Sequence, residues 1–242
     1  MQLKIILEGR NARLPLQYRR DVHGMIYYLL RDDPVYAQKL HDMTPNAGGK
    51  TLKGFCFGRL CGSYHMEENM ICYERDIQLE IRSAKPDIVL FLNRALQKRN
   101  RVLLAGESLA IKQTSLEDRL ITASELSIRM QSPLVAYRTI DNQGHTRFFA
   151  PWEEEFYTLI KSNAERKWNY FGNGSPFCFQ LDPLGAKQAK RVSDTFNGTY
   201  ITGYISPFKL KSTPEIIDLL YQTGLGAGNS MGFGMFDIEK EG

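Results

Sequence analysis

Two of the four histidines in this chain of 242 residues, His23 and His41, are candidates for donating or accepting a proton. Histidine suits proton transfer near neutral pH because its unperturbed pKa is about 6.5. His23 and Tyr27 are four residues apart, so a helix would place them on the same side. His41 ends a predicted helical segment, just before the Gly-rich sequence TPNAGGK. Because a surface histidine at a helix C-terminus is also favoured by the helix dipole, the residues alone leave both interpretations of His41 open.

The remaining histidines and the cysteines give no sign of a metal site or a disulfide framework. His65 lies in an apparent hairpin and His145 in a turn, and both are expected at the surface. The four cysteines form no CxxC pair, which argues against structural zinc and paired disulfides. Unpaired cysteines are typical of a reducing compartment, so we predict a cytoplasmic protein with no metal and no cofactor. Since no apolar run approaches the ~20 residues of a membrane span, no membrane partner is expected.

The net charge of +4 is modest, but the basic residues are clustered. Four of them lie between residues 94 and 101 with no acidic residue, and five lie between residues 185 and 211 against one acidic residue. Clustered positive charge is typical of a protein with a polyanionic partner, although any single cluster is better explained as a solvated surface. A third cluster consists of Arg10, Arg13, Arg19 and Arg20.

The predicted elements of the first half follow the order βαββαβ. The helix predicted over residues 21–31 has apolar residues at i, i+3, i+4, i+7 and i+8, and a later helix begins at Pro86. A further helical piece is predicted over residues 33–43. The predicted strands cover residues 3–8, 52–60, 70–82 and 102–112.

The second half repeats this order. Helices are predicted to begin at Pro151 and Pro214, and the strands are predicted over residues 123–137, 177–192, 195–205 and 231–238.

The order βαββαβ, occurring twice, is the ferredoxin-like arrangement. The sequence therefore predicts an α+β fold of two tandem ferredoxin-like, RRM-like units with a C-terminal Gly-rich loop. The predicted domains are residues 1–117, which carry the catalytic candidates, and residues 118–242, which carry a basic hairpin and the loop.

The glycine-rich sequence GLGAGNSMGFGMF begins at Gly224 and lies between a predicted helix and a predicted strand. A nucleotide-binding loop has the opposite context, because the N-terminus of the helix after it holds the phosphate. Gly224 is expected to end the helix, and Gly226, Gly228, Gly232 and Gly234 permit positive φ and close backbone approach. The N–H groups of such a loop could bind a phosphodiester backbone, or the loop could be a purely structural turn.

At the end of a second ferredoxin-like unit, this loop resembles the Gly-rich signature of the RAMP-type CRISPR-associated proteins. Together with RLPLQYRRDVHGMIYYLL near the N-terminus, it makes the chain similar to the sixth Cas protein family, with PWEEEFYTLIK as a supporting match. The resemblance covers essentially the whole chain. It implies an endoribonuclease that cuts the repeat RNA of a CRISPR transcript (pre-crRNA) into guide RNAs.

The resemblance also implies a metal-independent reaction in which the RNA's own 2′-OH attacks the adjacent phosphate, leaving a 2′,3′-cyclic phosphate and a 5′-OH. On the matching motifs, His41 transfers protons, Tyr27 orients the 2′-OH and Lys53 stabilises the developing phosphorane charge. Lys50 is an alternative to Lys53.

Two further residues remain open as alternatives within the same motifs. Tyr28 could replace its neighbour Tyr27, and His23 is a second histidine candidate.

For RNA binding, the chain offers the glycine loop together with Lys187, Lys190 and Arg191, and further candidates in Lys209 and Lys211. The implied partners are CRISPR repeat RNA, other Cas effector subunits and a second copy of the chain. The alternative function is a non-catalytic RAMP-type subunit that grips guide RNA. A small-molecule enzyme ranks lower, because the sequence has no cofactor motif.

Overall fold

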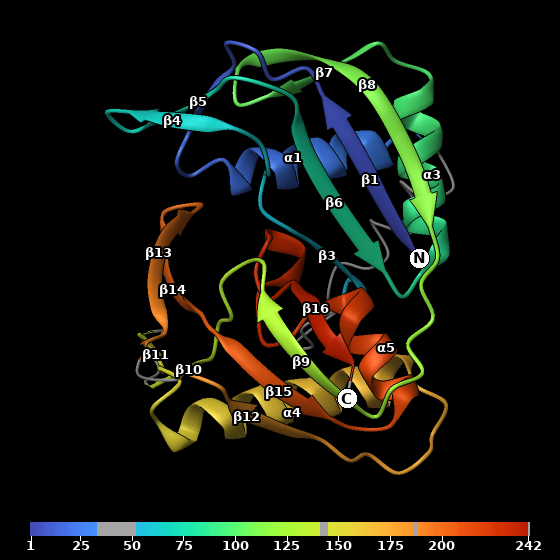
Figure 1. Cartoon of the computed structure of the whole chain (residues 1–242), viewed down its shortest axis with the longest axis vertical. Helices are drawn as coiled ribbons and strands as arrows, with labels where there is room; N and C mark the ends of the chain where they lie inside the picture. Colours follow the sequence, from blue (N-terminus) through green and yellow to red (C-terminus); the bar gives the residue numbers. More distant parts are fainter. Residues whose placement is uncertain (33–51, 141–144, 186–187, 242) are drawn as a thin grey trace. The chain divides into compact units, whose positions relative to one another are not determined.

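The computed structural model of the chain describes residues 1–32, 52–140, 145–185 and 188–241 (Figure 1). The chain divides into two compact units. The first comprises Met1–Phe55 and Arg59–Asp118, and the second comprises Cys56–Gly58 and Arg119–Gly242. The short segment Cys56–Gly58 thus belongs to a different unit from the residues on either side of it.

The main sheet of the first unit has five strands in the order β3-β6-β1-β8-β7. The central strand β1 pairs antiparallel with both β6 and β8. Its side chains alternate between the two faces, and Leu3, Ile5 and Leu7 are fully buried. The strands are β1 (Gln2–Leu7), β3 (Phe55–Phe57), β6 (Ile77–Ser83), β7 (Arg101–Leu104) and β8 (Glu107–Glu117).

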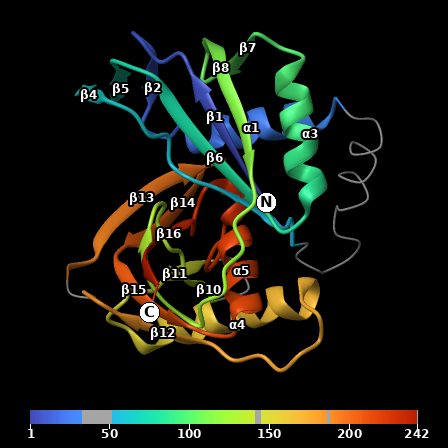
Figure 2. The same cartoon turned by 45° about the vertical axis from the view of Figure 1, so that its right-hand side comes forward.

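Helices α1 (Arg19–Leu30) and α3 (Pro86–Gln97) pack against this sheet and against each other (Figure 2). The apolar stripe predicted for the first helix is confirmed. With β3, β6 and β8 as the second, third and fourth strands, the order is that of a ferredoxin-like unit. The buried residues of α1 are Val22, Met25, Ile26, Leu29 and Leu30.

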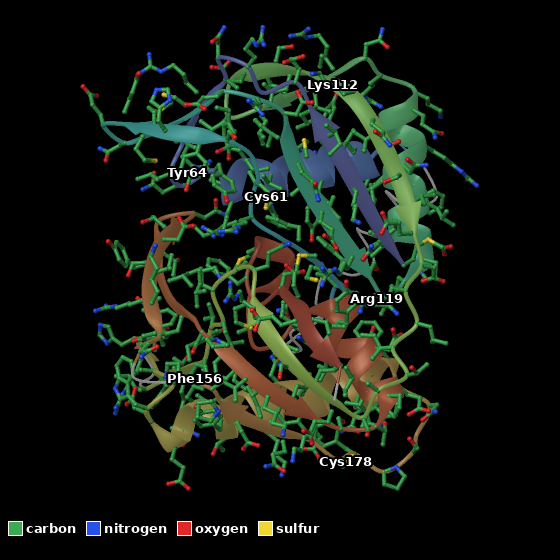
Figure 3. All side chains as sticks on the ribbon, viewed as in Figure 1. Cys61, Tyr64, Lys112, Arg119, Phe156 and Cys178 are labelled. Carbon is green, nitrogen blue, oxygen red and sulfur yellow. The ribbon has the colours of Figure 1, made fainter. Side chains whose placement is uncertain are left out.

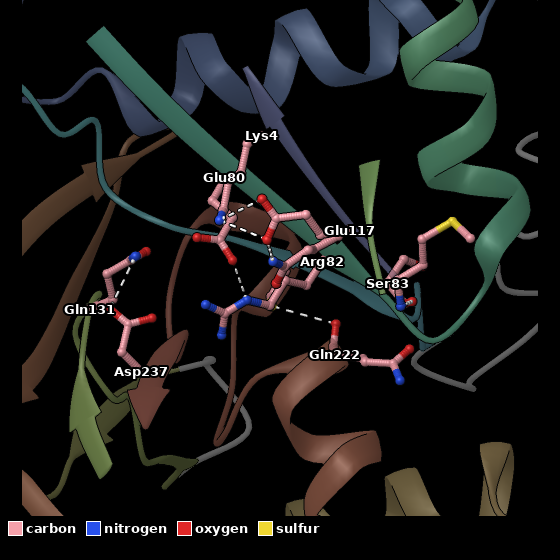
Figure 4. Close-up of polar contacts among 11 residues, drawn as sticks. Lys4, Glu80, Arg82, Ser83, Glu117, Gln131, Gln222 and Asp237 are labelled. Atoms are coloured by element: carbon pink, nitrogen blue, oxygen red, sulfur yellow. Dashed lines mark hydrogen bonds and ion pairs between the residues drawn. The ribbon is translucent and has the colours of Figure 1, made fainter. Parts of the chain in front are cut away.

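Polar side chains form ion pairs on this sheet, both between strands and within a strand (Figure 4). Lys4 on β1 donates to both carboxylate oxygens of Glu117 on β8, at 2.8 Å each. On β6, Arg82 is 1% exposed and its Nε donates to Glu80 at 2.6 Å. Removing either member of such a buried pair would leave an uncompensated charge.

A separate three-stranded sheet in the order β2-β5-β4 extends the first unit. The prediction of one strand over residues 70–82 is wrong, because β5 and β6 lie in different sheets. Exposed charged residues between them, Glu74 to Asp76, interrupt the buried pattern. The strands are β2 (Arg13–Pro15), β4 (Tyr64–Glu67) and β5 (Met70–Tyr73).

The second unit repeats the ferredoxin-like order in its four-stranded sheet β12-β15-β9-β16. Helices α4 (Glu154–Phe171) and α5 (Pro214–Thr223) contact each other. Among the residues that the structure describes, no helix combines the length and apolarity that a membrane span needs. The strands of the sheet are β9 (Glu125–Met130), β12 (Gln180–Pro183), β15 (Pro207–Lys211) and β16 (Phe236–Glu241).

Two hairpins are inserted into the second unit: β10 (Tyr137–Thr139) with β11 (Thr146–Phe148), and β13 (Lys190–Phe196) with β14 (Thr199–Ile205). The prediction that residues 195–205 form the third sheet strand is therefore wrong. That strand is β15, where Phe208 and Leu210 are fully buried. An alternating pattern marks a strand but does not say which sheet the strand joins.

Candidate active site and glycine-rich loop

His23 and Tyr27 lie on one side of α1 and contact each other. Their ring centroids are 4.4 Å apart, and the Tyr27 ring lies 6.3 Å from that of Phe55. Both side chains are half-buried, off the apolar stripe of the helix. The spacing of four residues on a helix, read from the sequence, thus brings these two side chains together as expected.

Lys53 belongs to the same cluster. It precedes Gly54, whose carbonyl oxygen accepts a hydrogen bond from the buried Ser83 hydroxyl at 2.8 Å. This anchor fixes the backbone next to Lys53 at the end of β6. The Lys53 charge is near enough to His23 to act on its ionisation.

The surroundings shift the pKa of all three groups in the cluster of His23, Tyr27 and Lys53, called the α1 cluster below. Burial lowers the pKa of His23, and the positive charge of Lys53 lowers it further. Burial also lowers the pKa of Lys53 and raises that of Tyr27. The surroundings therefore favour the neutral form of the imidazole, make the ammonium group a stronger acid and make the phenol a weaker one.

The other predicted catalytic residues lie elsewhere. His41 and Lys50 fall outside the described residues. Tyr28 is 63% exposed and stacks under the guanidinium of Arg99, 5.8 Å from its ring centroid. Arg99 in turn pairs with Asp32, so part of the basic cluster at residues 94–101 is engaged within the first unit.

The loop from Gly224 to Met235 joins α5 to β16 and is largely buried. Glycine is required at two positions in particular. At Gly234, φ is +74° and a Cβ would lie 1.9 Å from the Leu225 carbonyl oxygen. At Gly226, φ is +62° and a Cβ would lie 2.6 Å from the Val135 carbonyl oxygen. Both positions are explained by backbone packing.

Gly232 and Gly228 differ in exposure. Gly232 is buried against the ring of Phe57, while Gly228 is partly exposed at the start of the short helix η2 (Asn229–Met231). Of the four loop glycines predicted to bind RNA, Gly228 is the one that is not buried.

A buried lysine, which the sequence analysis missed, holds this loop. Lys167 on α4 is 3% exposed, and its Nζ donates to the Gly224 carbonyl oxygen and to Asn229 Oδ1, at 2.6 Å each, and to the Gly226 carbonyl oxygen at 3.4 Å. Burial lowers its pKa to about 7. Lys167 follows Phe156, Ile160 and Ala164 along the buried stripe of α4, and a lysine on such a stripe is the signal that could have revealed it.

The basic hairpin β13–β14 presents Lys190 and Arg191 as exposed residues on β13. On the opposite strand, Tyr200 is 67% exposed. Lys187 falls outside the described residues. Lys209 and Lys211, named as further candidates, both pair with Glu125 and are thereby partly neutralised.

A family model described as CRISPR associated protein Cas6, C-terminal, matches residues 114–238. The chain belongs to the Cas6 family. The match includes the glycine loop and the β13–β14 hairpin of this Cas6 chain, while the α1 cluster lies outside it.

Similarity to individual Cas6 proteins extends over different lengths. A segment of 103 residues, 42% of the chain, is 30% identical to the CRISPR-associated endoribonuclease Cas6 of Pyrococcus furiosus. That segment covers 38% of the relative, so the chain matches well under half of its length.

Solved structures match the whole chain. A Cas6-related protein from Pyrococcus furiosus superposes with a TM-score of 0.84 at 18% identity, over 100% of this chain and 99% of the other. A structure described as a RAMP protein binding different RNA substrates gives 0.83 at 18% identity, over 99% and 100%. At such identities the likeness shows the fold, which is the predicted α+β pair of ferredoxin-like units.

Proposed function

We propose that this Cas6-family chain is a metal-independent endoribonuclease that cuts CRISPR repeat RNA into guide RNAs. The observation that carries the proposal is the α1 cluster, where the His23 imidazole contacts the Tyr27 phenol and feels the positive charge of Lys53. Family membership supports the same conclusion, as does the similar relative described as an endoribonuclease.

In the proposed reaction, the 2′-oxygen of one nucleotide forms a bond to the adjacent phosphorus while the bond from phosphorus to the 5′-oxygen breaks. A base takes the 2′-OH proton and an acid supplies a proton to the departing 5′-oxygen. The products are a 2′,3′-cyclic phosphate and a 5′-OH. A positioned acid or base contributes roughly 10²–10⁴-fold to such a rate.

The residues divide these tasks by their pKa values and their motifs. His41, proposed from its motif, and His23, whose imidazole is neutral, are the candidates for proton transfer. Lys53 stabilises negative charge on the phosphorane, and its lowered pKa also suits protonation of the 5′-oxygen. Tyr27 orients the 2′-OH, because a phenol with a raised pKa is a poor base.

RNA binding is assigned to the second unit. Lys190 and Arg191 on β13, with Lys187 before them, contact the phosphates, and the partly exposed backbone at Gly228 adds N–H donors. The structure described as a RAMP protein binding different RNA substrates supports RNA as the ligand of this fold.

The test is cleavage of a CRISPR repeat RNA in the presence of a chelator. We expect one cut that leaves a cyclic or opened phosphate and a 5′-OH. His41→Ala should slow the cut by about 10²–10⁴-fold, and His145→Ala, at an exposed histidine of the second unit, should not.

Two results would overturn the proposal, and one would change its residue assignment. A cut that needs Mg²⁺ would contradict metal independence, and wild-type rates in His41→Ala would remove that residue from the mechanism. Tight binding of repeat RNA with no cut by the wild-type protein would favour the non-catalytic RAMP-type subunit.

A further inference from the structure

Three different ligand-bearing side chains converge on the small sheet β2-β5-β4. His65 on β4 and Cys72 on β5 are direct cross-strand partners, and Glu67 is two residues after His65, on the same face of β4. The ring nitrogen, the thiol sulfur and a carboxylate oxygen of these residues all lie within 4.8 Å of one another. Figure 3 locates this sheet by Tyr64, the first residue of β4.

A second carboxylate orients the imidazole. Glu74 Oε1 lies 3.2 Å from His65 Nδ1, while Glu67 Oε1 lies 3.3 Å from His65 Nε2. With both carboxylates accepting, both ring nitrogens carry protons in this geometry. A metal ion would replace the Nε2 proton, while Glu74 would keep accepting from Nδ1–H and so hold the tautomer. Glu74 thus presents Nε2 toward Glu67 and Cys72.

The remaining contacts hold Glu67 and Cys72 in place. Arg13 binds the second carboxylate oxygen of Glu67 at 3.0 Å, so one oxygen is left to face the histidine. The hydrogen bond from His65 lowers the pKa of Glu67 most, and a hydrogen bond from the Cys72 thiol to the same carboxylate lowers it further. A bound metal ion would take the place of that thiol proton.

We propose that His65 Nε2, Cys72 Sγ and Glu67 Oε1 bind a zinc ion, with Glu74 as the carboxylate that orients the histidine. Nitrogen, sulfur and oxygen are the ligands of zinc in proteins, at about 2.0–2.3 Å. A tetrahedral arrangement of such bonds spaces the ligand atoms by roughly 3.3–3.8 Å, so side-chain rotations close the site from the present spacing. With three protein ligands, the fourth position is left for water.

The ion would link β4 to β5 across the hairpin. All four residues of β4 are exposed, so little apolar burial stabilises the strand. Zinc bonds to His65 and Cys72 would stabilise its pairing with β5 instead. None of the ligands belongs to the α1 cluster, so the site is separate from the proposed RNA cleavage. No CxxC pair in the sequence signals this site. His65 and Cys72 are neighbours because of the strand register, which their spacing in the sequence does not reveal.

The test begins with the full chain stripped of metal by a chelator that is then removed. Zn²⁺ is titrated by calorimetry, and Co²⁺ by absorption, slightly above neutral pH, because hydrogen bonds to Glu67 and Glu74 raise the pKa of His65 and protons compete. We expect one ion per chain, a cobalt–thiolate absorption band, and release of the Cys72 proton, seen as a buffer-dependent heat.

Matched variants decide the outcome. His65→Gln should abolish the tight site and Glu74→Gln should weaken it about 10–100-fold. Cys72→Ser should remove the thiolate band, whereas Cys178→Ser, at an exposed cysteine of the second unit (Figure 3), should leave it unchanged.

Because Cys72 is buried, His65→Gln at an exposed side chain is the decisive variant if Cys72→Ser does not fold. Circular dichroism verifies the fold of each protein. Absence of tight binding in the wild type, equal binding by His65→Gln, or loss of the thiolate band in Cys178→Ser would each overturn the proposal.

Discussion

Lys167 is a buried amine whose partners, within the residues that the structure describes, are oxygen acceptors and no carboxylate. Its acceptors are two backbone oxygens and one amide oxygen of the glycine loop, and Asn229 Nδ2 donates in turn to the Leu225 and Phe233 carbonyl oxygens. Without the lysine, the Gly224 and Gly226 carbonyl oxygens would lose this donor. The side chain therefore holds the loop in place as well as filling space.

Replacing Lys167 by methionine keeps the volume and removes the donors. Because buried acceptors without a partner cost about 1–3 kcal/mol, we expect the free energy of unfolding to fall by about that amount. Chemical denaturation measures the change. Lys161→Met, at an exposed lysine of the same helix, is the control and should differ little from the wild type; an equal loss in both variants would contradict the role.

The lowered pKa of His23 makes a prediction about the pH dependence of cleavage. A base must be neutral, and the ordinary histidine pKa is about 6.5. If His23 is the base, the rate is lost as pH falls through a value below 6.5, because burial and Lys53 lower the pKa. The measurement is kcat/KM against pH, with His23→Gln for comparison.

An acidic limb at or above the ordinary histidine value, unchanged in His23→Gln, would assign the base to another group such as His41. Sequence alone ranked His41 first, since that residue lies in the matching motif. The contact between His23 and Tyr27 was implied by their spacing. The contact of Tyr27 with Phe55, and the Lys53 charge that lowers the His23 pKa further than burial alone, involve residues distant in the chain and were not.

At the scale of elements, the β13–β14 hairpin separates two groups of basic residues that the sequence presented together. Lys190 and Arg191 are exposed on the hairpin, whereas Lys209 and Lys211 lie on β15 and pair with Glu125. The charge cluster was visible in the sequence. The division of the cluster into two groups was not visible. Glu125 lies more than eighty residues before the lysines and meets them only through the pairing of β9 with β15.

This division predicts a difference in salt dependence. For single-stranded RNA, each phosphate contact contributes about 0.7 to the slope of log K against log salt concentration. Replacing both Lys190 and Arg191 by alanine should reduce the slope by about 1.4. The matched double variant of Lys209 and Lys211 should change it less. Binding titrations at several salt concentrations measure both, and equal changes would contradict the assignment.

At the scale of the whole molecule, the repeated order βαββαβ could be predicted because apolar periodicity and helix start signals mark each element locally. Strand partners could not be predicted in the same way. The pattern led to one strand over residues 70–82 where there are two, and it missed β15 altogether. Both errors concern insertions between the second and third sheet strands, where an extra hairpin leaves the local pattern unchanged.

The proposed reaction makes a prediction for the whole complex with RNA. A repeat RNA with a 2′-deoxy nucleotide at the cut site lacks the nucleophile, so it should bind as the normal RNA does but remain intact. It should therefore inhibit cleavage of the normal RNA competitively. Gel-shift and cleavage assays measure the two properties, and cleavage of the deoxy RNA would exclude attack by the 2′-oxygen.

The bond between Lys167 and the loop also bears on protein engineering. A glycine loop transferred from a related protein would place its carbonyl oxygens differently. Lys167 is positioned for the acceptors of the present loop, so it would not match those of the new one. The loop, which includes Asn229, and the lysine therefore form one exchangeable module. A chimaera that moves both should keep its stability, whereas one that moves the loop alone should lose it.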